Sequence, residues 1–388
     1  MINNRKKNIA IVGAGNGGCI TALHYHLEAP NEIDKITIYH HPDHPIEKVG
    51  QGSVGSGSML INNFFHLNFQ DHNIVQSTRK EGIMYENWGK VNHKFFHSFP
   101  QSSTAIHYIP NLLSKAVLES GVFEVVEKKI TDPEREIDSD FIFDCRGRNN
   151  RDPDLYDKII NPLNSVILAS KDEIIPDLFY TRTVATPNGW TFVIPNVGGT
   201  SYGYLYNNTI TTKEEATADF TERFDVVPSS FIEFDNYVAK TFFSGERTIL
   251  NGNRAAFLEP LEATSAGIYE YIAEMTQGYV AMGLDSKENC DAIIRKEVFK
   301  METFVLWHYR FGSKYDTPFW DYAKSLPFNP DSEFKQVFDY CMNNSYHDIV
   351  RRTCRERNPV NSMYSQWNSW SVKNWADGMG IDKTHKIL

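Results

Sequence analysis

The chain opens with an alternation of apolar and mixed segments that predicts a strand, a helix and a second strand. Residues 8–12 (NIAIV) form a short apolar run suited to a buried parallel strand. A glycine-rich turn (GAGNGG) and a helical segment (CITALHYHL) follow over residues 13–27, and a second strand (KITIYH) spans residues 35–40. A turn of glycines between strand and helix is typical of a nucleotide-binding βαβ unit.

The glycine turn has the GxGxxG spacing at Gly13, Gly15 and Gly18. Gly13 permits the tight turn, Gly15 lets the backbone approach a pyrophosphate, and Gly18 lets the helix pack on the strand. The positive end of the helix then faces the phosphates. We therefore expect a dinucleotide site rather than a merely structural turn, with contacts to Gly13, Ala14, Gly15, Asn16, Gly17 and Gly18.

The end of the second strand departs from this pattern. An Asp or Glu is expected there to bind a ribose hydroxyl, but the chain has His40 and His41, with Asp43 further on. Either Asp43 substitutes, or the ribose is bound by backbone and water. His40, His41 and His44 could also suggest a metal site, but a polar loop after a strand is the simpler interpretation, and we expect no metal.

A later strand favours FAD over NAD. Residues 140–148 (DFIFDCRGR) form an apolar strand that ends in Asp144 and is followed by Gly147. Such a strand returns to the first sheet and passes the cofactor, so we expect Asp144 to contact it. The long gap before this strand is typical of FAD folds with an inserted substrate region, not of compact NAD domains.

Composition and charge restrict the classes of partner that the protein is expected to bind. The 388 residues are 41% hydrophobic and 23% charged, as in an ordinary globular protein. The net charge of -10 argues against a nucleic-acid or membrane-surface partner, and no run of about 18 apolar residues predicts a membrane span. The cysteines form no CxxC pair, so reduced thiols in a cytoplasmic protein are expected; they are Cys19, Cys145, Cys290, Cys341 and Cys354.

Six segments resemble, in the same order, the flavin-dependent tryptophan halogenase family between residues 8 and 320. They are GAGNGG (13–18), STRKEGIMYENWG (77–89), GWTFVIP (189–195), GYLYNNTITTKEEA (203–216), NGNRAAFLEPLEATSAGIYE (251–270) and FVLWHYRFGSKYDTPFW (304–320). The third is similar to the family's WxWxIP element and the fifth to its PLEST-G-IY segment. Each match is modest alone, but their common order is hard to reconcile with chance.

The resemblance implies an α/β fold, with a Rossmann-like FAD-binding module of the glutathione-reductase type, an inserted β-sheet and a mostly helical substrate-binding region. We expect a discontinuous FAD module of residues 1–80, 105–170 and 245–285. Residues 81–104, 171–244 and 286–388 would form the substrate-binding module and a helical cap. Beyond the glycine turn and Asp144, the cofactor is expected to contact Gly50, Ser53, Ile130 and Ile268.

The resemblance also implies the chemistry. In this family reduced FAD, O2 and a halide give hypohalous acid, which an essential lysine delivers to an electron-rich aromatic ring. Lys80 takes the place of that lysine, and Glu262 that of a glutamate that orients the oxidant or accepts the ring proton. A lysine in an apolar pocket loses its charge or donates a directed hydrogen bond, and a carboxylate nearby suits a base. Glu259 is a weaker competitor for the acid's role.

The halide is expected at the start of the helix after Glu262, where backbone N–H groups bind anions. Thr264 takes the place of the family's threonine, and Ser265 and Gly267 complete the expected halide site. The family has Thr-Gly here, whereas Ser265 and Ala266 intervene in this chain. If they enlarge an anion loop, bromide or iodide is preferred over chloride.

Two other elements differ from the family in detail. Trp190, Ile194 and Pro195 match its tryptophan element, but Phe192 replaces the second tryptophan. We expect these four residues to wall the tunnel between flavin and substrate, to fill the core, or both. The glycine-rich segment 49–58, here called the strap, is similar to a family segment that touches the flavin, with Ser53 at the position of its glutamate.

The resemblance thins after Trp320. Trp367, Trp370 and Trp375 either stack on a substrate ring or, more simply, cap a hydrophobic core. The short cap leaves tryptophan, free indole, a phenol or another heteroaromatic ring open as substrate. No NAD(P)H site is evident, so a separate flavin reductase is expected to supply reduced FAD. A homo-oligomer is left open, and the alternative functions are a flavin monooxygenase and a non-catalytic flavin-binding protein.

Overall fold

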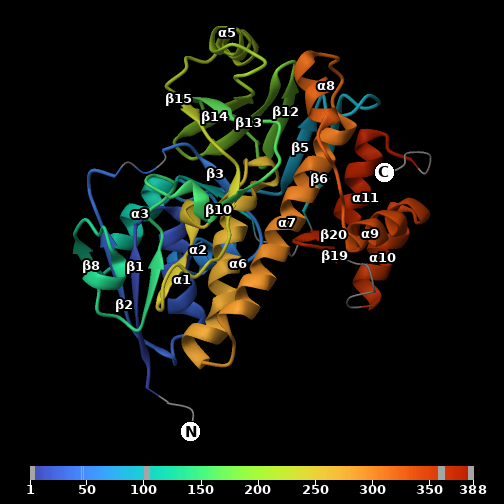
Figure 1. The fold of residues 1–388 in the computed structure, drawn as a ribbon. Coiled ribbons are helices and arrows are strands. Elements are labelled where there is room, and N and C mark those ends of the chain that lie inside the picture. Colours follow the sequence, from blue (N-terminus) through green and yellow to red (C-terminus); the bar gives the residue numbers. More distant parts are fainter. Residues whose placement is uncertain (1–4, 45, 47, 100–104, 357–362, 383–388) are drawn as a thin grey trace.

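The computed structural model describes residues 5–44, 46, 48–99, 105–356 and 363–382, with the backbone alone for 353–356. In Figure 1 a parallel sheet with its helices lies at the lower left, a large mixed sheet lies above it, and the C-terminal helices lie on the right. The α/β class, the inserted sheet and the helical C-terminal region expected from the sequence are thereby confirmed.

The first sheet has five parallel strands in the order β17-β9-β1-β2-β8. The strands are β1 (Lys7–Val12), β2 (Ile33–His40), β8 (Glu124–Glu127), β9 (Phe141–Asp144) and β17 (Thr248–Leu250). Helix α1 (Asn16–Glu28) packs against α2 (Ser56–Phe65), α3 (Pro110–Leu118) and α6 (Thr264–Gln277), while the short α4 (Pro133–Glu136) precedes β9. β1 is apolar because strand and helix neighbours cover it from all sides.

The second sheet has seven strands in the order β15-β11-β14-β13-β12-β5-β6, antiparallel except for the β12–β5 pair. They are β5 (Gly82–Glu86), β6 (Lys94–Ser98), β11 (Ser165–Lys171), β12 (Thr181–Thr186), β13 (Gly189–Asn196), β14 (Gly199–Tyr206) and β15 (Ser230–Glu233). Helix α5 (Lys213–Phe224) packs on β14 over a small separate core. Strands of the two large sheets interleave along the sequence, and the division into two modules stays a prediction.

Three small sheets join these layers. β3 (Gln51–Ser53), β7 (Ile106–Tyr108) and β4 (Thr78–Arg79) form one, with β7 in the middle. β10 (Tyr156–Lys158), β16 (Tyr237–Ala239) and β18 (Ala256–Phe257) form the second, and β19 (Met363–Tyr364) pairs with β20 (Trp367–Asn368). The strap, the Lys80 segment and residues 105–108 therefore meet in a single small sheet.

The C-terminal region is helical. It comprises α7 (Lys287–Phe311), α8 (Pro318–Ser325), α9 (Ser332–Asn343), α10 (Tyr346–Glu356) and α11 (Ser369–Met379). Helix α7 begins after Ser286, whose side chain accepts the N–H of Asn289, and it ends at Gly312, whose φ of 70° a side chain rarely adopts. No helix formed by the described residues is long and apolar enough to cross a bilayer.

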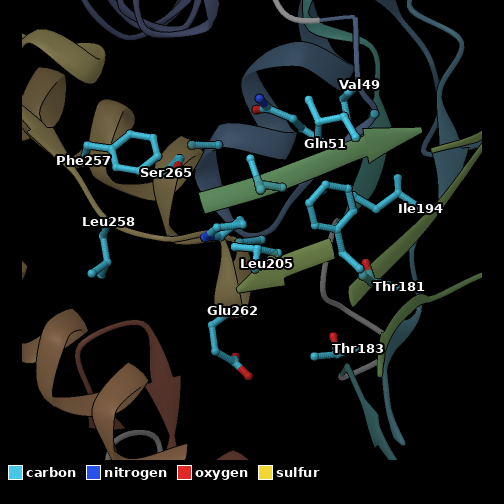
Figure 2. A pocket seen from close by; sticks show the side chains of 18 of the residues that line it. Val49, Gln51, Thr181, Thr183, Ile194, Leu205, Phe257, Leu258, Glu262 and Ser265 are labelled. Carbon is cyan, nitrogen blue, oxygen red and sulfur yellow. The ribbon is translucent and has the colours of Figure 1, made fainter. Parts of the chain in front are cut away.

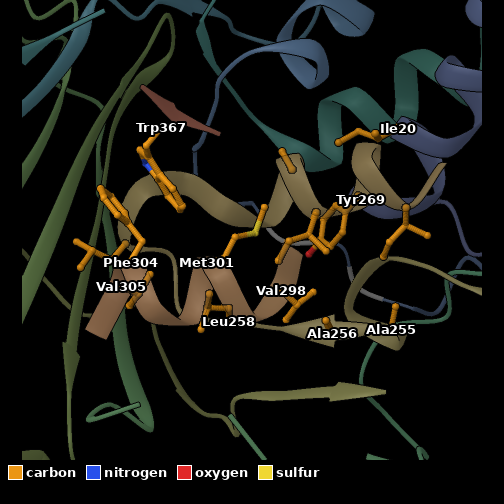
Figure 3. Packing of buried hydrophobic residues seen from close by; sticks show 14 of the residues in the cluster. Ile20, Ala255, Ala256, Leu258, Tyr269, Val298, Met301, Phe304, Val305 and Trp367 are labelled. Atoms are coloured by element: carbon orange, nitrogen blue, oxygen red, sulfur yellow. The ribbon is translucent and has the colours of Figure 1, made fainter. Parts of the chain in front are cut away.

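One continuous core connects the nucleotide-type unit with the C-terminal region. Figure 3 shows Ile20 of α1 and Tyr269 of α6 on one side, and Val298 and Phe304 of α7 on the other, with Trp367 at the end of the cluster. All five side chains are buried. The C-terminal helices thus share one hydrophobic core with the helices of the parallel-sheet unit.

Two glycines of the first turn differ sharply in their surroundings. A Cβ on Gly17, inside α1, would lie 2.5 Å from the Cα of Gly252, so the helix and the turn at residue 252 touch backbone to backbone. A Cβ on Gly15 would meet nothing within 4 Å. Gly17 is therefore required by packing, whereas Gly15 faces open space.

We expect Gly17→Ala to lower the free energy of unfolding by about 1–3 kcal/mol, because the methyl group must displace backbone. An alanine inside a helix ordinarily stabilises it by up to about 1 kcal/mol, so the sign is diagnostic. Gly15→Ala is the matched control and should leave stability nearly unchanged. Urea unfolding of the three proteins checks this, and equal stabilities would contradict the packing argument.

Candidate functional site

A largely apolar cavity lies where the strap, the large sheet and the segment 253–269 meet. In Figure 2 side chains from these three parts border one space, with Val49 and Gln51 from the strap, Ile194 from the sheet, and Glu262 and Ser265 from the third segment. Among the described residues that line it, the charged side chains are Lys80, Arg148 and Glu262. The cavity thus brings together two residues that the sequence singled out.

Lys80 is held at this cavity by the small β3-β7-β4 sheet. It follows β4 directly, and its backbone N–H donates to the carbonyl of Ala105 at 3.0 Å. The side chain is only 2% exposed, with its Nζ 5.5 Å from the centre of the Phe99 ring. Burial lowers the pKa of Lys80 to about 8, and the charge of Glu262 opposes this by favouring the ammonium form. Both protonation states are therefore accessible near neutral pH.

Glu262 sits in a strained turn at the edge of the cavity. Its φ is 69° and that of Ala263 is 54°, both in the left-handed region that side chains rarely adopt. The carboxylate accepts hydrogen bonds from Tyr85 Oη and from Trp367 Nε1 (2.8 Å), and its Oε1 lies 3.1 Å from His308 Nε2. Three different parts of the chain thus orient one acid.

The partner of Glu262 on α7 is itself oriented. His308 Nδ1 lies 2.7 Å from the carbonyl oxygen of Phe304. A carbonyl only accepts, so Nδ1 carries a proton. Nε2 then faces the carboxylate of Glu262. The bond to Phe304 therefore fixes which nitrogen of His308 meets the acid.

Glu259, the competing acid, points elsewhere. It is fully buried and does not line the cavity. Its carboxylate accepts the indole N–H of Trp190 at 3.1 Å and the hydroxyl of Tyr309 at 2.7 Å. Burial raises the pKa of Glu259 to about 7, because no cation compensates it. Glu259 therefore anchors the wall residue Trp190 from behind.

The wall of the cavity is formed by alternate residues of β13. Trp190, Phe192 and Ile194 line it, whereas Pro195 points away and its carbonyl accepts a hydrogen bond from Thr78 Oγ1 at 2.8 Å. The Phe192 ring lies so close to Gly203 that a Cβ there would meet its Cζ at 2.1 Å. The wall and the core are thus built from the same strand.

The expected halide residues lie at the N-terminus of α6. Thr264 and Ser265 are the first two helical residues, and their N–H groups lack partners within the helix, whereas the N–H of Gly267 is the first that can bond within it, to the carbonyl of Ala263. Ser265 lines the cavity, and the buried Oγ1 of Thr264 has no hydrogen-bond partner among the described residues. The enlarged anion loop expected from Ser265 and Ala266 is wrong: both are helical, because the left-handed turn at residues 262–263 ends before them.

The dinucleotide-type turn borders the strap. Asn16, the first residue of α1, donates to Gln51 Oε1 at 2.8 Å and accepts from the hydroxyl of Tyr108 at 2.7 Å. Gly13 has a φ of 110°, and a Cβ there would lie 2.5 Å from the carbonyl oxygen of Cys145. Open space next to Gly15 and Gly147 leaves room for a ligand at the helix N-terminus.

The remaining predicted cofactor residues lie apart from one another. Asp144 ends β9, where its carboxylate accepts two hydrogen bonds from Arg146, at 2.8 and 2.7 Å. Gly50 lines the cavity and donates its N–H to Ser201 Oγ at 2.8 Å. Ser53, Ile130 and Ile268 are buried and do not line the cavity. Their contact with a cofactor stays a prediction.

Two further groups of candidate residues make ordinary contacts: the end of β2 is an exposed polar loop, and the C-terminal tryptophans pack in the core. Asp43 is 89% exposed and its N–H donates to His41 Nδ1 at 3.3 Å. The described residues contain no group of three His, Cys, Asp or Glu side chains placed to hold a metal ion. Trp367, Trp370 and Trp375 are all buried, the first stacking on Phe304 at 3.9 Å between ring centres.

Sequence reasoning missed Tyr85, His308 and Trp367 as partners of Glu262. Tyr85 and His308 lie within two of the segments that carry the family resemblance, STRKEGIMYENWG and FVLWHYRFGSKYDTPFW. A histidine among aromatic residues near the end of a helix was the available signal. Trp367 lies beyond the resemblance, and no local pattern placed it beside Glu262.

Comparison with known proteins identifies the family of the chain. The sequence model of the tryptophan halogenase family matches residues 8–120 and 115–377. The chain is 28% identical over 221 residues to tryptophan 7-halogenase RebH of Lentzea aerocolonigenes, covering 52% of this chain and 41% of that protein. It is 24% identical over 253 residues to tryptophan 6-halogenase ThaL of Streptomyces albogriseolus, covering 60% and 46%. The matches thus span about half the length of these relatives.

Solved structures share the fold over nearly the whole chain. Xcc4156, a flavin-dependent halogenase from Xanthomonas campestris, superposes with a TM-score of 0.80 at 16% identity, covering 98% of this chain and 90% of that one. BrvH, a flavin-dependent halogenase from Brevundimonas sp. BAL3, superposes with a TM-score of 0.75 at 19% identity, covering 99% and 92%.

The buried ammonium of Lys80 predicts a pH-dependent cost in stability. An unfolded lysine titrates near about 10.4, whereas the pKa of folded Lys80 is about 8. Between these values the unfolded chain binds more protons, so Lys80 makes the free energy of unfolding rise with pH. We expect Lys80→Met to be more stable than the parent near pH 7, by about 1–3 kcal/mol, and this difference to vanish above pH 10.

Urea unfolding of both proteins at the two pH values measures the difference. Comparing the two cancels the titration of buried cysteines and tyrosines, which they share. Lys90→Met, which removes a half-exposed lysine, is the control and should show no such difference. Lower stability of Lys80→Met at neutral pH would mean that Lys80 is well compensated in the folded state.

Proposed function

The chain belongs to the tryptophan halogenase family, and on that premise we propose that it is a flavin-dependent halogenase of electron-rich aromatic rings. One observation carries the proposal: Lys80 and Glu262, the two residues that this chemistry requires, line the same cavity, and the charge of Glu262 acts on Lys80. They are 182 positions apart in the sequence, so their meeting is a product of the fold.

FAD fits the features of the first turn. The N-terminus of α1 and the space beside Gly15 and Gly147 suit a pyrophosphate, and we propose that the strap residues Gly50 and Gln51 border the flavin. When bound, reduced FAD supplies, with O2 and a halide, the oxidising equivalent that becomes hypohalous acid. The N–H groups at the start of α6, together with the unpartnered hydroxyl of Thr264, would hold the halide.

Lys80 and Glu262 would each assist one step of the halogen transfer. The Lys80 ammonium donates a hydrogen bond to the oxygen of hypohalous acid and so polarises the O–halogen bond. The ring attacks the halogen, a carbon–halogen bond forms, and the departing hydroxide takes a proton from Lys80 to give water. Glu262 accepts the proton lost from the ring carbon. Return of that proton to Lys80 restores both groups, and His308 keeps the carboxylate oriented throughout.

The cavity favours a substrate with little charge. Apart from Lys80, Arg148 and Glu262, the described residues that line it are uncharged and mostly apolar. We propose an indole or phenol-type ring rather than a strongly charged compound. A separate flavin reductase would provide reduced FAD. The preference for bromide or iodide stays a prediction, although the loop that motivated it is part of a helix.

The decisive experiment is mass spectrometry of products from a panel of indoles and phenols with reduced FAD and chloride, bromide or iodide in turn. We expect a product heavier by one halogen that appears only when halide is present. An oxygenated product formed regardless of halide would indicate a monooxygenase. Tight FAD binding without any product would indicate a non-catalytic flavin-binding protein.

Lys80→Ala should lower the halogenation rate by about 10²- to 10⁴-fold, the range for losing a positioned proton donor. FAD binding should stay intact, because the pyrophosphate site proposed at the glycine turn is made of backbone N–H groups and does not use the Lys80 side chain. Arg79→Ala, which removes the half-exposed neighbouring cation, is the control. Activity retained in Lys80→Ala would remove the central claim.

A further inference from the structure

The three segments that build the site meet at one buried histidine. His107 lies in β7, the middle strand of the small sheet, where it pairs with Gly52 of the strap on one side and with Thr78 on the other. Directly paired residues of antiparallel strands present their side chains on the same face. Lys80 lies two residues after Thr78, so its side chain leaves the backbone on the same face as that of Thr78. His107 therefore stands between the strap and the lysine.

Hydrogen bonds fix which nitrogen of His107 carries its proton. Thr78 Oγ1 donates its hydrogen to the carbonyl of Pro195 at 2.8 Å. It lies 3.0 Å from His107 Nδ1 and must accept there, so Nδ1 is protonated. Nε2 lies 2.8 Å from Thr181 Oγ1 and, in a neutral ring, accepts from that hydroxyl. Burial, reinforced by the charge of Lys80, holds the pKa of His107 well below its usual range, which keeps the ring neutral.

The side chain of Lys80 reaches across this ring to the strap. A Cβ on Gly52 would lie 2.8 Å from Lys80 Nζ and 3.5 Å from His107 Cδ2. The ammonium group thus rests on the glycine backbone, with the edge of the imidazole beside it. The ring beside Nζ is itself fixed by hydrogen bonds to Thr78 of β4 and Thr181 of β12, so the position of Nζ depends on it.

We propose that His107, as the neutral Nδ1–H tautomer, is a positioning residue that fixes Lys80 against the strap and ties it, through Thr78, to Pro195 of β13, the strand that forms the cavity wall. The Nδ1 side is the more important one, because Thr78 links the ring both to the lysine strand and to Pro195. No role in the chemistry itself is assigned to His107. The proposal rests on the proposed function only where activity is measured.

Three substitutions separate the two sides of the ring. His107→Asn keeps an amide N–H close to the position of Nδ1, His107→Gln places an amide close to the position of Nε2, and His107→Phe keeps the volume without either bond. We expect the kcat of His107→Phe and His107→Gln to fall by about 10²-fold, the cost of misplacing a reacting group by about 1 Å. His107→Asn should retain clearly more activity. The KM for the aromatic substrate and the Kd for FAD should change little in all three.

The tautomer is tested without any turnover. In protein labelled with ¹⁵N-histidine, the His107 signals are assigned by their loss in His107→Asn, and Nδ1 should show the shift of a protonated nitrogen and Nε2 that of an unprotonated one. His66→Asn, at an exposed left-handed position that asparagine tolerates, is the control for folding and activity.

Each outcome decides a different point. A protonated Nε2, or stronger rescue by Gln than by Asn, would overturn the assignment of the ring. Normal kcat in His107→Phe would overturn the positioning role. If the parent protein halogenates nothing while Nδ1 proves protonated, the proposed function fails and the hydrogen-bond assignment stands.

Discussion

The burial of three ionisable groups is the constraint on which the rest of the structure depends. Lys80, Glu259 and Glu262 would each be costly to bury without partners. For the two acids the fold offsets this cost with directed hydrogen-bond partners: Tyr85, His308 and Trp367 for Glu262, and Trp190 and Tyr309 for Glu259. Most of these donors are large aromatic side chains, which also supply the apolar surroundings. The chemistry of the site and the packing of the core are for this reason made of the same residues.

Helix α7 connects the two acids. Its adjacent residues His308 and Tyr309 point to different carboxylates, one at the cavity and one behind its wall. Glu259 and Glu262 are three residues apart, but the left-handed turn at 262 and 263 sends their side chains in different directions. The turn is strained, and the hydrogen bonds made by the side chains of Glu259 and Glu262 hold it in place. Strain of this kind persists only where the surroundings determine the conformation.

Sequence reasoning gave the local elements and the two central residues, and it failed where long-range packing decides. The strand, turn and helix of residues 7–28 follow from apolar runs and glycines, because these are properties of neighbours in the chain. Lys80 and Glu262 were found through family segments. A helix start after Glu262 was expected, but the helical conformation of Ser265 and Ala266 was missed, because it depends on the two left-handed residues before them. Trp367 was seen as a core residue, but its hydrogen bond to Glu262 depends on how the β19–β20 hairpin docks beside α7.

That hairpin has a consequence for redesign. Glu262 has hydrogen-bond partners in β5, α7 and β20, which means that the C-terminal region contributes directly to the environment of this acid. Exchanging the C-terminal helices for those of a relative in order to change substrate preference would also exchange a ligand of the acid. A chimaera would need to preserve the helical phase of α7 and an indole at position 367.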